Sequence, residues 1–329
     1  MKILLTGSVA FDYLMSFPGY FRDHILPDKL DSISLSFLVD AMIKAPGGIA
    51  PNIAYTMALL GEHPSLWAAV GEDFEEYRKF LDSKGIDTTG ARVIPHVFTA
   101  SFFVNTDKAN CQIASFYPGA MAFASQLSLH DLADDPPNLV VISPNDPGAM
   151  NQYVRECQEL GFPYAYDPSQ QIVRLTGDDL RVGLEGTLAL FVNDYEYALI
   201  DKMTGLDADC VLDNNPAAFV VVTKGEKGAQ VHTNSGRYDI PIVPPQQILD
   251  PTGVGDAFRG GFLTGYSHHL EMEQCGRMGA LAATYCLEQR GPQGHSYTTR
   301  EFIDRYRQAF KDAGALDSLL VQKSKKKTK

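Results

Sequence analysis

Short, mainly apolar runs recur along this chain, and most of them end where a turn or a helical stretch begins. They lie at residues 2–5, 66–70, 139–142, 162–166, 188–192 and 219–222. Runs of four or five apolar residues are typical of strands that are buried on both faces. Strands that alternate with helices build a mostly parallel sheet with helices on both sides. The sequence therefore predicts a doubly wound α/β fold.

The totals are consistent with one domain of this kind. The chain has 329 residues, of which 45% are hydrophobic and 21% charged, so a sizeable core can form. The net charge of −12 argues against a nucleic-acid partner. We expect residues 1–322 to form the domain and the lysine-rich residues 323–329 to be a disordered, solvated tail.

Cysteine spacing and hydropathy bear on where the protein works. The five cysteines are scattered without the spacing of a metal site. No secretory signal opens the chain, and no apolar run approaches the roughly 18 residues that span a bilayer. We therefore expect a cytoplasmic protein without a membrane partner.

Two stretches, residues 13–46 and 95–118, depart from the alternation of strand and helix. Within the first, residues 32–39 alternate in polarity, which predicts a strand. Within the second, residues 99–105 and 111–116 flank a polar turn, which predicts a hairpin. Two β excursions from one α/β body are what a small β-sheet lid would require.

A glycine-rich turn carries a carboxylate where a helical pattern starts. It is Asp250-Pro251-Thr252-Gly253-Val254-Gly255-Asp256. Glycine lets the backbone turn sharply, so successive N–H groups can converge at the helix N-terminus and bind an anion. Asp256 then has two interpretations: it caps the helix, or it accepts a proton from an attacking hydroxyl group.

This turn resembles the second signature of the ribokinase (PfkB) family of small-molecule kinases, with Val254 where the family usually has alanine. Gly47-Gly48-Ile49-Ala50-Pro51-Asn52 resembles the first signature, and the two occur in the family's order. The resemblance implies a ribokinase-like fold with a β-sheet lid, ATP as phosphate donor and Mg²⁺. It leaves open whether a monovalent cation such as K⁺ is also needed.

The resemblance also implies roles for single residues. Asp256 would be the base, beside an anion hole formed by Gly253, Val254 and Gly255. Sugar hydroxyls would be bound by Ser8, Asp12, Gly48 and Asn52. The ATP phosphates would be approached by Asn193, Thr223, Gly225, Gly228 and Thr252. Mg²⁺ would lie, through water, near Glu196 and Asn193. Without the resemblance, Asp12 is as readily a turn residue, and residues 223–228 a plain turn between strands.

Longer runs resemble bacterial adenosine kinases of the actinobacterial type within this family. They lie at residues 7–19, 35–40, 112–121, 167–171, 193–196 and 250–259. This implies adenosine as the acceptor and AMP as the product, a reaction of purine salvage. A purine needs flat apolar walls, for which Phe102 and Phe116 on the predicted lid strands are candidates.

The same resemblance bears on the surroundings of the nucleoside. It implies that Gln170 or Gln171 approaches the nucleoside, and the sequence does not decide between them. It also implies a homodimer through the lid, in which Ser36 and Phe37 reach the site of the neighbouring subunit.

Three alternative functions stay open. The acceptor can be inosine, guanosine or cytidine, because a few contacts decide between bases. A sugar kinase such as ribokinase or fructokinase shares both signatures. A nucleoside-binding protein without catalysis would share the fold, but the intact Asp256, with its glycines, argues against it.

Overall fold

The computed structural model describes residues 1–320 and contains one large sheet and one small one. The large sheet has nine strands in the order β13-β12-β11-β10-β9-β8-β1-β4-β5 within these residues. In chain order they are β1 (Ile3–Thr6), β4 (Ser65–Val70), β5 (Ala91–Val93), β8 (Leu139–Ile142), β9 (Tyr164–Tyr166), β10 (Ala189–Asn193), β11 (Phe219–Thr223), β12 (Ala229–Thr233) and β13 (Gly236–Ile240). All pairings are parallel except those of β11 with β12 and β12 with β13.

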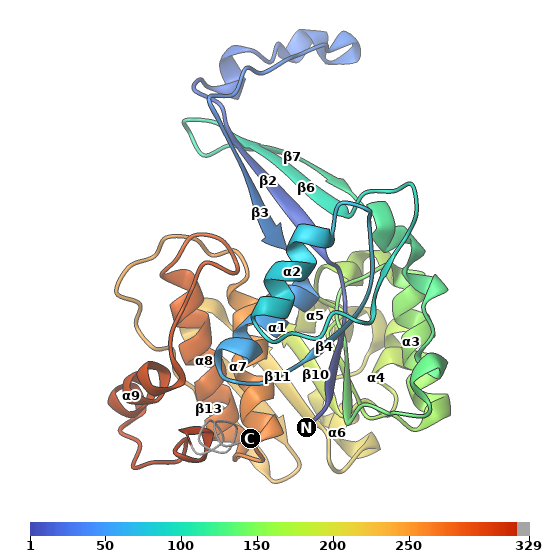
Figure 1. The fold of residues 1–329 in the computed structure, drawn as a ribbon, viewed down its shortest axis with the longest axis vertical. Coiled ribbons are helices and arrows are strands. Elements are labelled where there is room, and N and C mark those ends of the chain that lie inside the picture. The colour runs from blue at the N-terminus through green and yellow to red at the C-terminus, as the bar shows by residue number, and fades with distance from the viewer. Residues whose placement is uncertain (321–329) are drawn as a thin grey trace.

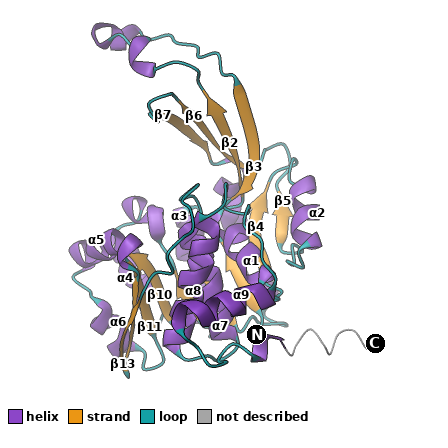
Figure 2. Cartoon of the chain, turned by 90° about the vertical axis from the view of Figure 1, so that its left-hand side faces the viewer, coloured by secondary structure: helices purple, strands orange, loops and turns teal. Residues whose placement is uncertain are grey.

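Helices cover both faces of this sheet, as the apolar strands predict (Figures 1 and 2). They are α1 (Ile49–Leu59), α2 (Glu75–Ser83), α3 (Pro147–Leu160), α4 (Gly177–Leu184), α5 (Asp194–Thr204), α6 (Ala208–Asn214), α7 (Val254–Ser267), α8 (Met272–Leu287) and α9 (Thr299–Phe310). Ile3 and Leu5 of β1 belong to the core cluster that contains residues of α1 and α7, whereas Leu4 belongs to the cluster under α3 and α4. The period of two residues thus gives the sheet two buried faces.

Helices α7 and α8 pack at close range because small residues line their contact. A Cβ added at Gly261 would lie 2.6 Å from the carbonyl oxygen of Met278, and one added at Gly265 would lie 3.1 Å from the Cα atom of Cys275. These glycines of α7 therefore lie at its contact with α8. This packing fixes the direction in which the start of α7 points.

The small sheet is the expected lid, and it projects from the body (Figures 1 and 2). Its strand order is β3-β2-β6-β7, with β2 (Ala10–Ser16), β3 (Ala41–Gly47), β6 (Ala100–Thr106) and β7 (Gln112–Tyr117). The predicted hairpin is confirmed as β6 and β7, which pair antiparallel. The lid begins at Ala10, three residues before the expected start at residue 13.

The strand predicted at residues 32–39 is wrong. The chain forms two short 3₁₀ turns, Phe21–Asp23 and Pro27–Ser32, and the first excursion returns through β3 instead. Phe37 packs against Phe17 and Phe21 at ring-centroid distances of 5.0 and 4.9 Å. Of the alternating apolar residues, Phe37 therefore joins an aromatic cluster at the lid tip, whereas Ile33 and Leu35 are exposed.

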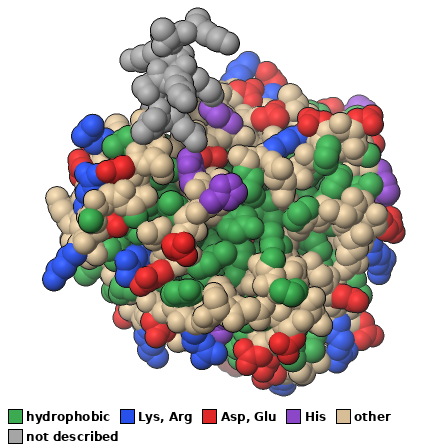
Figure 3. Space-filling model, turned by 90° about the horizontal axis from the view of Figure 1, so that it is seen from below, with side chains coloured by type: hydrophobic (Ala, Val, Ile, Leu, Met, Phe, Trp, Pro, Cys, Tyr) green, Lys and Arg blue, Asp and Glu red, His purple; other side chains and the backbone are tan. Residues whose placement is uncertain are grey.

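Other expectations concern the surface and the chain end. Among the helices of residues 1–320, none combines the length and the apolar character that crossing a bilayer requires. On the coloured part of the face opposite the lid, acidic and basic side chains are interspersed around hydrophobic ones (Figure 3). The basic tail expected at residues 323–329 lies outside the described residues.

Candidate active site

The glycine-rich turn ends at the first turn of α7. Gly253 is left-handed, with φ of 77°, and a Cβ there would lie 2.4 Å from Cβ of Pro292, so glycine is required. Among the described residues, the amides of Gly253, Gly255 and Asp256 have no acceptor, and that of Val254 makes one long bond, 3.4 Å, to the Pro251 carbonyl. The turn therefore presents the unpaired N–H groups that an anion needs.

Asp256 is the third residue of α7 and does not cap it. Its Oδ2 accepts a hydrogen bond of 2.9 Å from the side-chain amide of Asn52, and its Oδ1 lies 3.7 Å from Nη1 of Arg259. Burial raises the pKa of Asp256 to about 6, although Arg259 and Asn52 both favour the ionised form. The carboxyl group therefore titrates close to neutral pH, as a general base should.

Asn52 is held in turn by Gln293, which the sequence analysis did not single out. Nε2 of Gln293 donates to Oδ1 of Asn52 at 2.9 Å and to the hydroxyl of Tyr77 at 2.5 Å. The Tyr77 hydroxyl donates to the Gly47 carbonyl at 3.0 Å. This buried chain of hydrogen bonds links the start of α7 to the end of β3. No local pattern around Gln293 marks it, because its partners lie far away in sequence.

The predicted sugar-binding residues meet beside Asp256. Asp12 lies on β2 at the root of the lid, and burial, followed by the charges of Asp250 and Asp256, raises its pKa to about 6. Ser8 accepts a hydrogen bond of 3.2 Å from the amide of Ile49. Gly48 caps α1 with φ of 94°, and a Cβ there would lie 2.5 Å from the Ser8 carbonyl oxygen. The end of strand β1, strand β2 and the start of helix α1 thus lie together beside Asp256.

Asp250 and Thr252 fix the shape of the turn. The carboxylate of Asp250 accepts hydrogen bonds from the amides of Thr252 and Gly291, each of 2.9 Å. Burial opposes ionisation of Asp250, but these bonds lower its pKa. The Thr252 carbonyl accepts a hydrogen bond from the thiol of Cys286 on α8. Asp250 is therefore a structural anion of the loop.

The two candidate aromatic walls lie side by side on the lid. Phe102 of β6 is directly opposite Asp12 of β2 and Phe116 of β7, so the three side chains share one face of the sheet. Phe102 is partly buried and Phe116 is 50% exposed. Ser36 and Phe37 do not join them, because they belong to the segment at the far end of the lid (Figure 1).

The Asn-x-x-Glu motif forms a capping box at the start of α5. Asn193 Oδ1 accepts from the amide of Glu196 and Glu196 Oε2 accepts from the amide of Asn193, both at 2.8 Å. Oε1 of Glu196 accepts from the hydroxyl of Ser169 at 3.2 Å. Among the described residues no group of three potential side-chain ligands could by itself hold a metal ion. A magnesium ion at this motif would therefore depend on water and on phosphate oxygens.

The remaining phosphate-site candidates lie at the end of β11. Thr223 lines a small cavity of about 10 Å³ together with Gly255 and Arg259, so strand β11 and the anion hole are neighbours. Gly225 and Gly228 form the tight connection from β11 to β12, in which the amide of Lys224 donates to the Gly228 carbonyl at 2.7 Å. Both the plain-turn interpretation and the phosphate interpretation of this segment are compatible with that geometry.

Gln170 and Gln171 lie on a 3₁₀ turn, Ser169–Arg174, that follows β9. Gln170 is exposed and its Oε1 accepts a hydrogen bond of 3.2 Å from Ser169. Gln171 is buried, and its Oε1 has no partner among the described residues. The structure therefore distinguishes the two glutamines by exposure.

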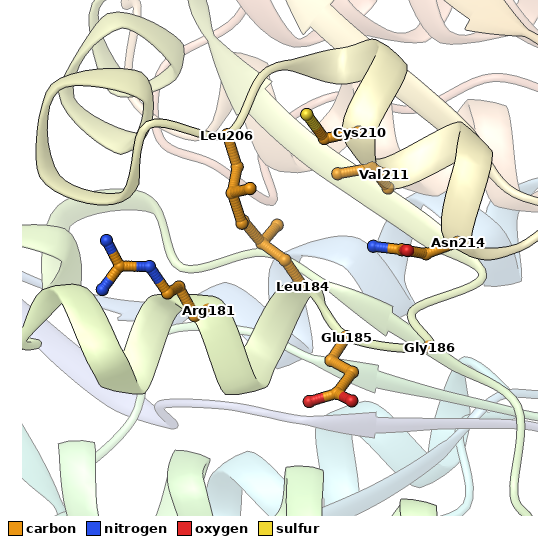
Figure 4. A pocket seen from close by; sticks show the side chains of 8 residues that line it. All are labelled: Arg181, Leu184, Glu185, Gly186, Leu206, Cys210, Val211 and Asn214. Atoms are coloured by element: carbon orange, nitrogen blue, oxygen red, sulfur yellow. The ribbon is translucent and has the colours of Figure 1, made fainter.

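A cavity of about 410 Å³ lies elsewhere, between α4 and α6, and none of the predicted site residues lines it (Figure 4). Its Arg181 donates hydrogen bonds to Asp178 and to the Thr204 carbonyl. We locate the active site at the root of the lid instead, because the perturbed carboxyl groups and the unpaired amides meet there.

Comparisons with known proteins show the family of this chain. A family profile described as pfkB family carbohydrate kinase matches residues 14–300. The nucleoside kinase of Burkholderia thailandensis, solved with inosine, is 34% identical with a TM-score of 0.82, over 94% of this chain and 99% of that one. It was also solved with ADP-inosine.

Two further proteins are similar to this chain. The nucleoside kinase of Methanocaldococcus jannaschii is 28% identical over 313 residues, which are 92% of this chain and 96% of that protein. The adenosine kinase of Sinorhizobium meliloti, at 21% identity and a TM-score of 0.71 over 94% of this chain and 99% of that one, shares the fold.

Proposed function

Because this chain belongs to the pfkB family of carbohydrate kinases, we propose that it transfers the γ-phosphate of ATP to the 5′-hydroxyl group of a purine nucleoside. The observation that carries the proposal is the buried Asp256, which lies between unpaired helix amides and the carboxyl group of Asp12. A base, an anion hole and a hydroxyl-binding carboxylate are the parts that phosphoryl transfer to an alcohol needs.

In the proposed reaction Asp256 accepts the proton of the 5′-hydroxyl group as its oxygen attacks the γ-phosphorus. The new O–P bond forms while the bond from the γ-phosphorus to the β–γ bridging oxygen breaks, and ADP leaves with that electron pair. The amides at Gly253, Val254 and Gly255 stabilise the charge on the transferring group. Closure of the lid would exclude water and so suppress ATP hydrolysis.

The lid favours a nucleoside over a free sugar as acceptor. Phe102 and Phe116 extend the face that carries Asp12, so a ribose bound by Asp12 would place its base against the two rings. Two neighbouring aromatic rings on one face of the lid would cover one apolar face of a purine, which a free sugar does not have. The two similar nucleoside kinases support the same choice.

Among nucleosides, we propose inosine and adenosine as the main acceptors. The similar protein solved with inosine is 34% identical to this chain, whereas the similar adenosine kinase, at 21%, supports the fold alone. This favours a broader acceptor range than adenosine alone. Guanosine and cytidine remain candidates for weaker turnover.

Three further parts of the proposal concern the ion, the assembly and the location. Mg²⁺, when bound with ATP, would neutralise charge on the phosphates. Glu196, whose carboxylate accepts a hydrogen bond from the amide of Asn193, would lie near the ion.

A homodimer would form through the lid, whose strand β7 is exposed along its length. The proposed location is the cytoplasm.

Identification of the product tests the proposed function. Phosphorus NMR of a reaction with ATP, Mg²⁺ and inosine is expected to show a nucleoside 5′-monophosphate and an equal amount of ADP. Adenosine should give the corresponding product. Release of inorganic phosphate without any nucleotide product would contradict the proposal.

A further inference from the structure

Arg259 lies one turn along α7 from Asp256, and its guanidinium group turns back toward the start of the helix. Nη1 of Arg259 lies 3.7 Å from Oδ1 of Asp256. A Cβ added at Gly255 would lie 2.9 Å from the same Nη1, so the guanidinium group covers Gly255. The Arg259 side chain is only 12% exposed. One buried positive charge therefore touches both the base and the anion hole.

Asp167 holds this guanidinium group from another element. It follows β9 directly, it is fully buried, and its Oδ1 accepts a hydrogen bond of 2.6 Å from Nη2 of Arg259. Burial raises the pKa of Asp167 to about 7, while Arg259 lowers it and Glu196 raises it. A charge buried to this extent requires a partner, so the pair keeps Arg259 in one position.

The other charges around Asp256 are negative. They belong to Asp12 at the lid root and to Asp167 after β9. Cys286 on α8 also interacts with Asp256, but burial raises the pKa of its thiol to about 12, so it is uncharged. The charge of Asp250 raises the pKa of Asp12, and the charge of Glu196 raises the pKa of Arg259. The charge of Arg290 lowers the pKa of Asp250. Within residues 1–320, Arg259 is the one cation that acts on Asp256 itself.

We propose that Arg259, held by Asp167, is a positioning residue that keeps Asp256 ionised and ready to accept the proton of the acceptor hydroxyl group. The kinetic part of this inference rests on the proposed function. Arg259 exchanges no proton itself, because a guanidinium group stays protonated throughout the working pH range. Its removal should raise the pKa of Asp256, since an opposite charge at this distance favours the carboxylate.

The kinetic test compares Arg259→Gln with Arg259→Lys. In the glutamine variant the acid limb of the pH profile of kcat/KM should move up by about one pH unit, and the loss should be about fivefold at pH 6 and much smaller at pH 8.5. The lysine variant keeps the charge and should leave the limb nearly in place. Arg300→Gln, which changes an exposed arginine of α9, is the matched control. An equal loss at every pH would overturn the inference.

A direct titration separates this inference from the proposed function. Carbon-13 NMR of carboxyl-labelled aspartates, with Asp256→Asn to assign the signal, measures the pH at which the Asp256 carboxyl group is half ionised. The measurement does not depend on turnover. We expect about 6 in the unmodified protein and a higher value in Arg259→Gln. The double variant Asp167→Asn/Arg259→Gln should show the same rise, and it leaves no unpaired buried carboxylate if Arg259→Gln alone does not fold. An unchanged midpoint in a folded variant overturns the inference, whereas a raised midpoint without nucleoside phosphorylation supports it and contradicts only the proposed function.

Discussion

The side-chain amide of Asn52 donates a hydrogen bond of 2.9 Å to the carboxylate of Asp256, although the two residues are 204 positions apart. The oxygen of the same amide accepts a hydrogen bond from Gln293. The nitrogen of Asn52 must therefore face Asp256, because the oxygen is already engaged. Helix α1, which carries the first signature, thus orients the proposed base, which the second signature supplies.

Replacement of the base tests its chemical role. Asp256→Asn should lower kcat by about 10³-fold, because a carboxamide cannot accept the proton of the attacking hydroxyl group. Nucleoside binding, measured by calorimetry, should change by less than about threefold, because asparagine has the same shape and keeps an oxygen toward Asn52. A variant with normal turnover would show that Asp256 is not the base.

The pH profile of the unmodified protein should follow two carboxyl groups. Burial raises the pKa of Asp12 and of Asp256 from 3.8 to about 6. The base acts when ionised, so kcat/KM should be maximal above pH 7 and fall as the pH drops through 6. Below the midpoint the fall should be about tenfold or more per pH unit, since both groups become protonated. A profile that stays flat down to pH 5 would refute this ionisation scheme.

Asp12 should contribute to function at the expense of stability. Its raised pKa means that the folded protein binds a proton more tightly than the unfolded chain, so its carboxylate destabilises the fold increasingly as pH rises from 3.8 to about 6. Asp12→Asn should therefore raise Tm at pH 7.5 by on the order of 2 °C and change it less at pH 5. The same variant should raise KM for the nucleoside by about tenfold or more. A lower Tm at pH 7.5 would contradict the linkage.

The two glycines of the anion hole should respond differently to alanine. Gly253→Ala forces a side chain into a left-handed residue against Pro292, so it should cost stability, about 1–3 kcal/mol. Gly255→Ala meets only the end of the Arg259 side chain, so it should fold normally and lose activity as that guanidinium group shifts. Thermal unfolding and kcat/KM distinguish the two. Equal stability losses would argue against the assigned contacts.

The aromatic face of the lid should act on the base of the nucleoside. Phe116→Ala should raise KM for inosine by about tenfold, because one base–ring contact is lost. Tyr117→Ala is the matched control, since Tyr117 is the next residue on β7 and therefore points to the other face. Equal effects of the two substitutions would mean that the lid contributes stability instead of a base-binding surface.

The sequence predicts those parts of the fold that depend on short-range pattern. Apolar runs identify six of the nine strands that the described residues contribute to the large sheet but not β5, β12 and β13, and glycines mark the turn before α7. The error at residues 32–39 arises because an alternating pattern does not require strand pairing: Phe37 joins an aromatic cluster, while Ile33 and Leu35 are exposed. The sequence is also ambiguous at Asn193 and Glu196. The same four residues form a capping box at the start of α5, which their spacing alone does not reveal.

Long-range partners in the candidate site are the part that sequence reasoning does not reach. Asp167 and Arg259 are 92 positions apart, and Asn52 and Gln293 are 241 apart. Asp167 and Arg259 both lie in runs that resemble known kinases, yet nothing in those runs says that the two form an ion pair. Only the folded chain shows which carboxylate keeps the arginine beside the base.

The most direct measurement is kcat/KM with ATP for inosine, adenosine, guanosine, cytidine, ribose and fructose, with Asp256→Asn measured in parallel. We expect a purine nucleoside to exceed ribose and fructose by about 10²-fold or more, because the sugars lack the base that the lid rings contact. The Asp256→Asn variant should lose turnover with every acceptor. A preference for ribose or fructose would contradict the nucleoside assignment, and full activity of the variant would contradict the role of Asp256.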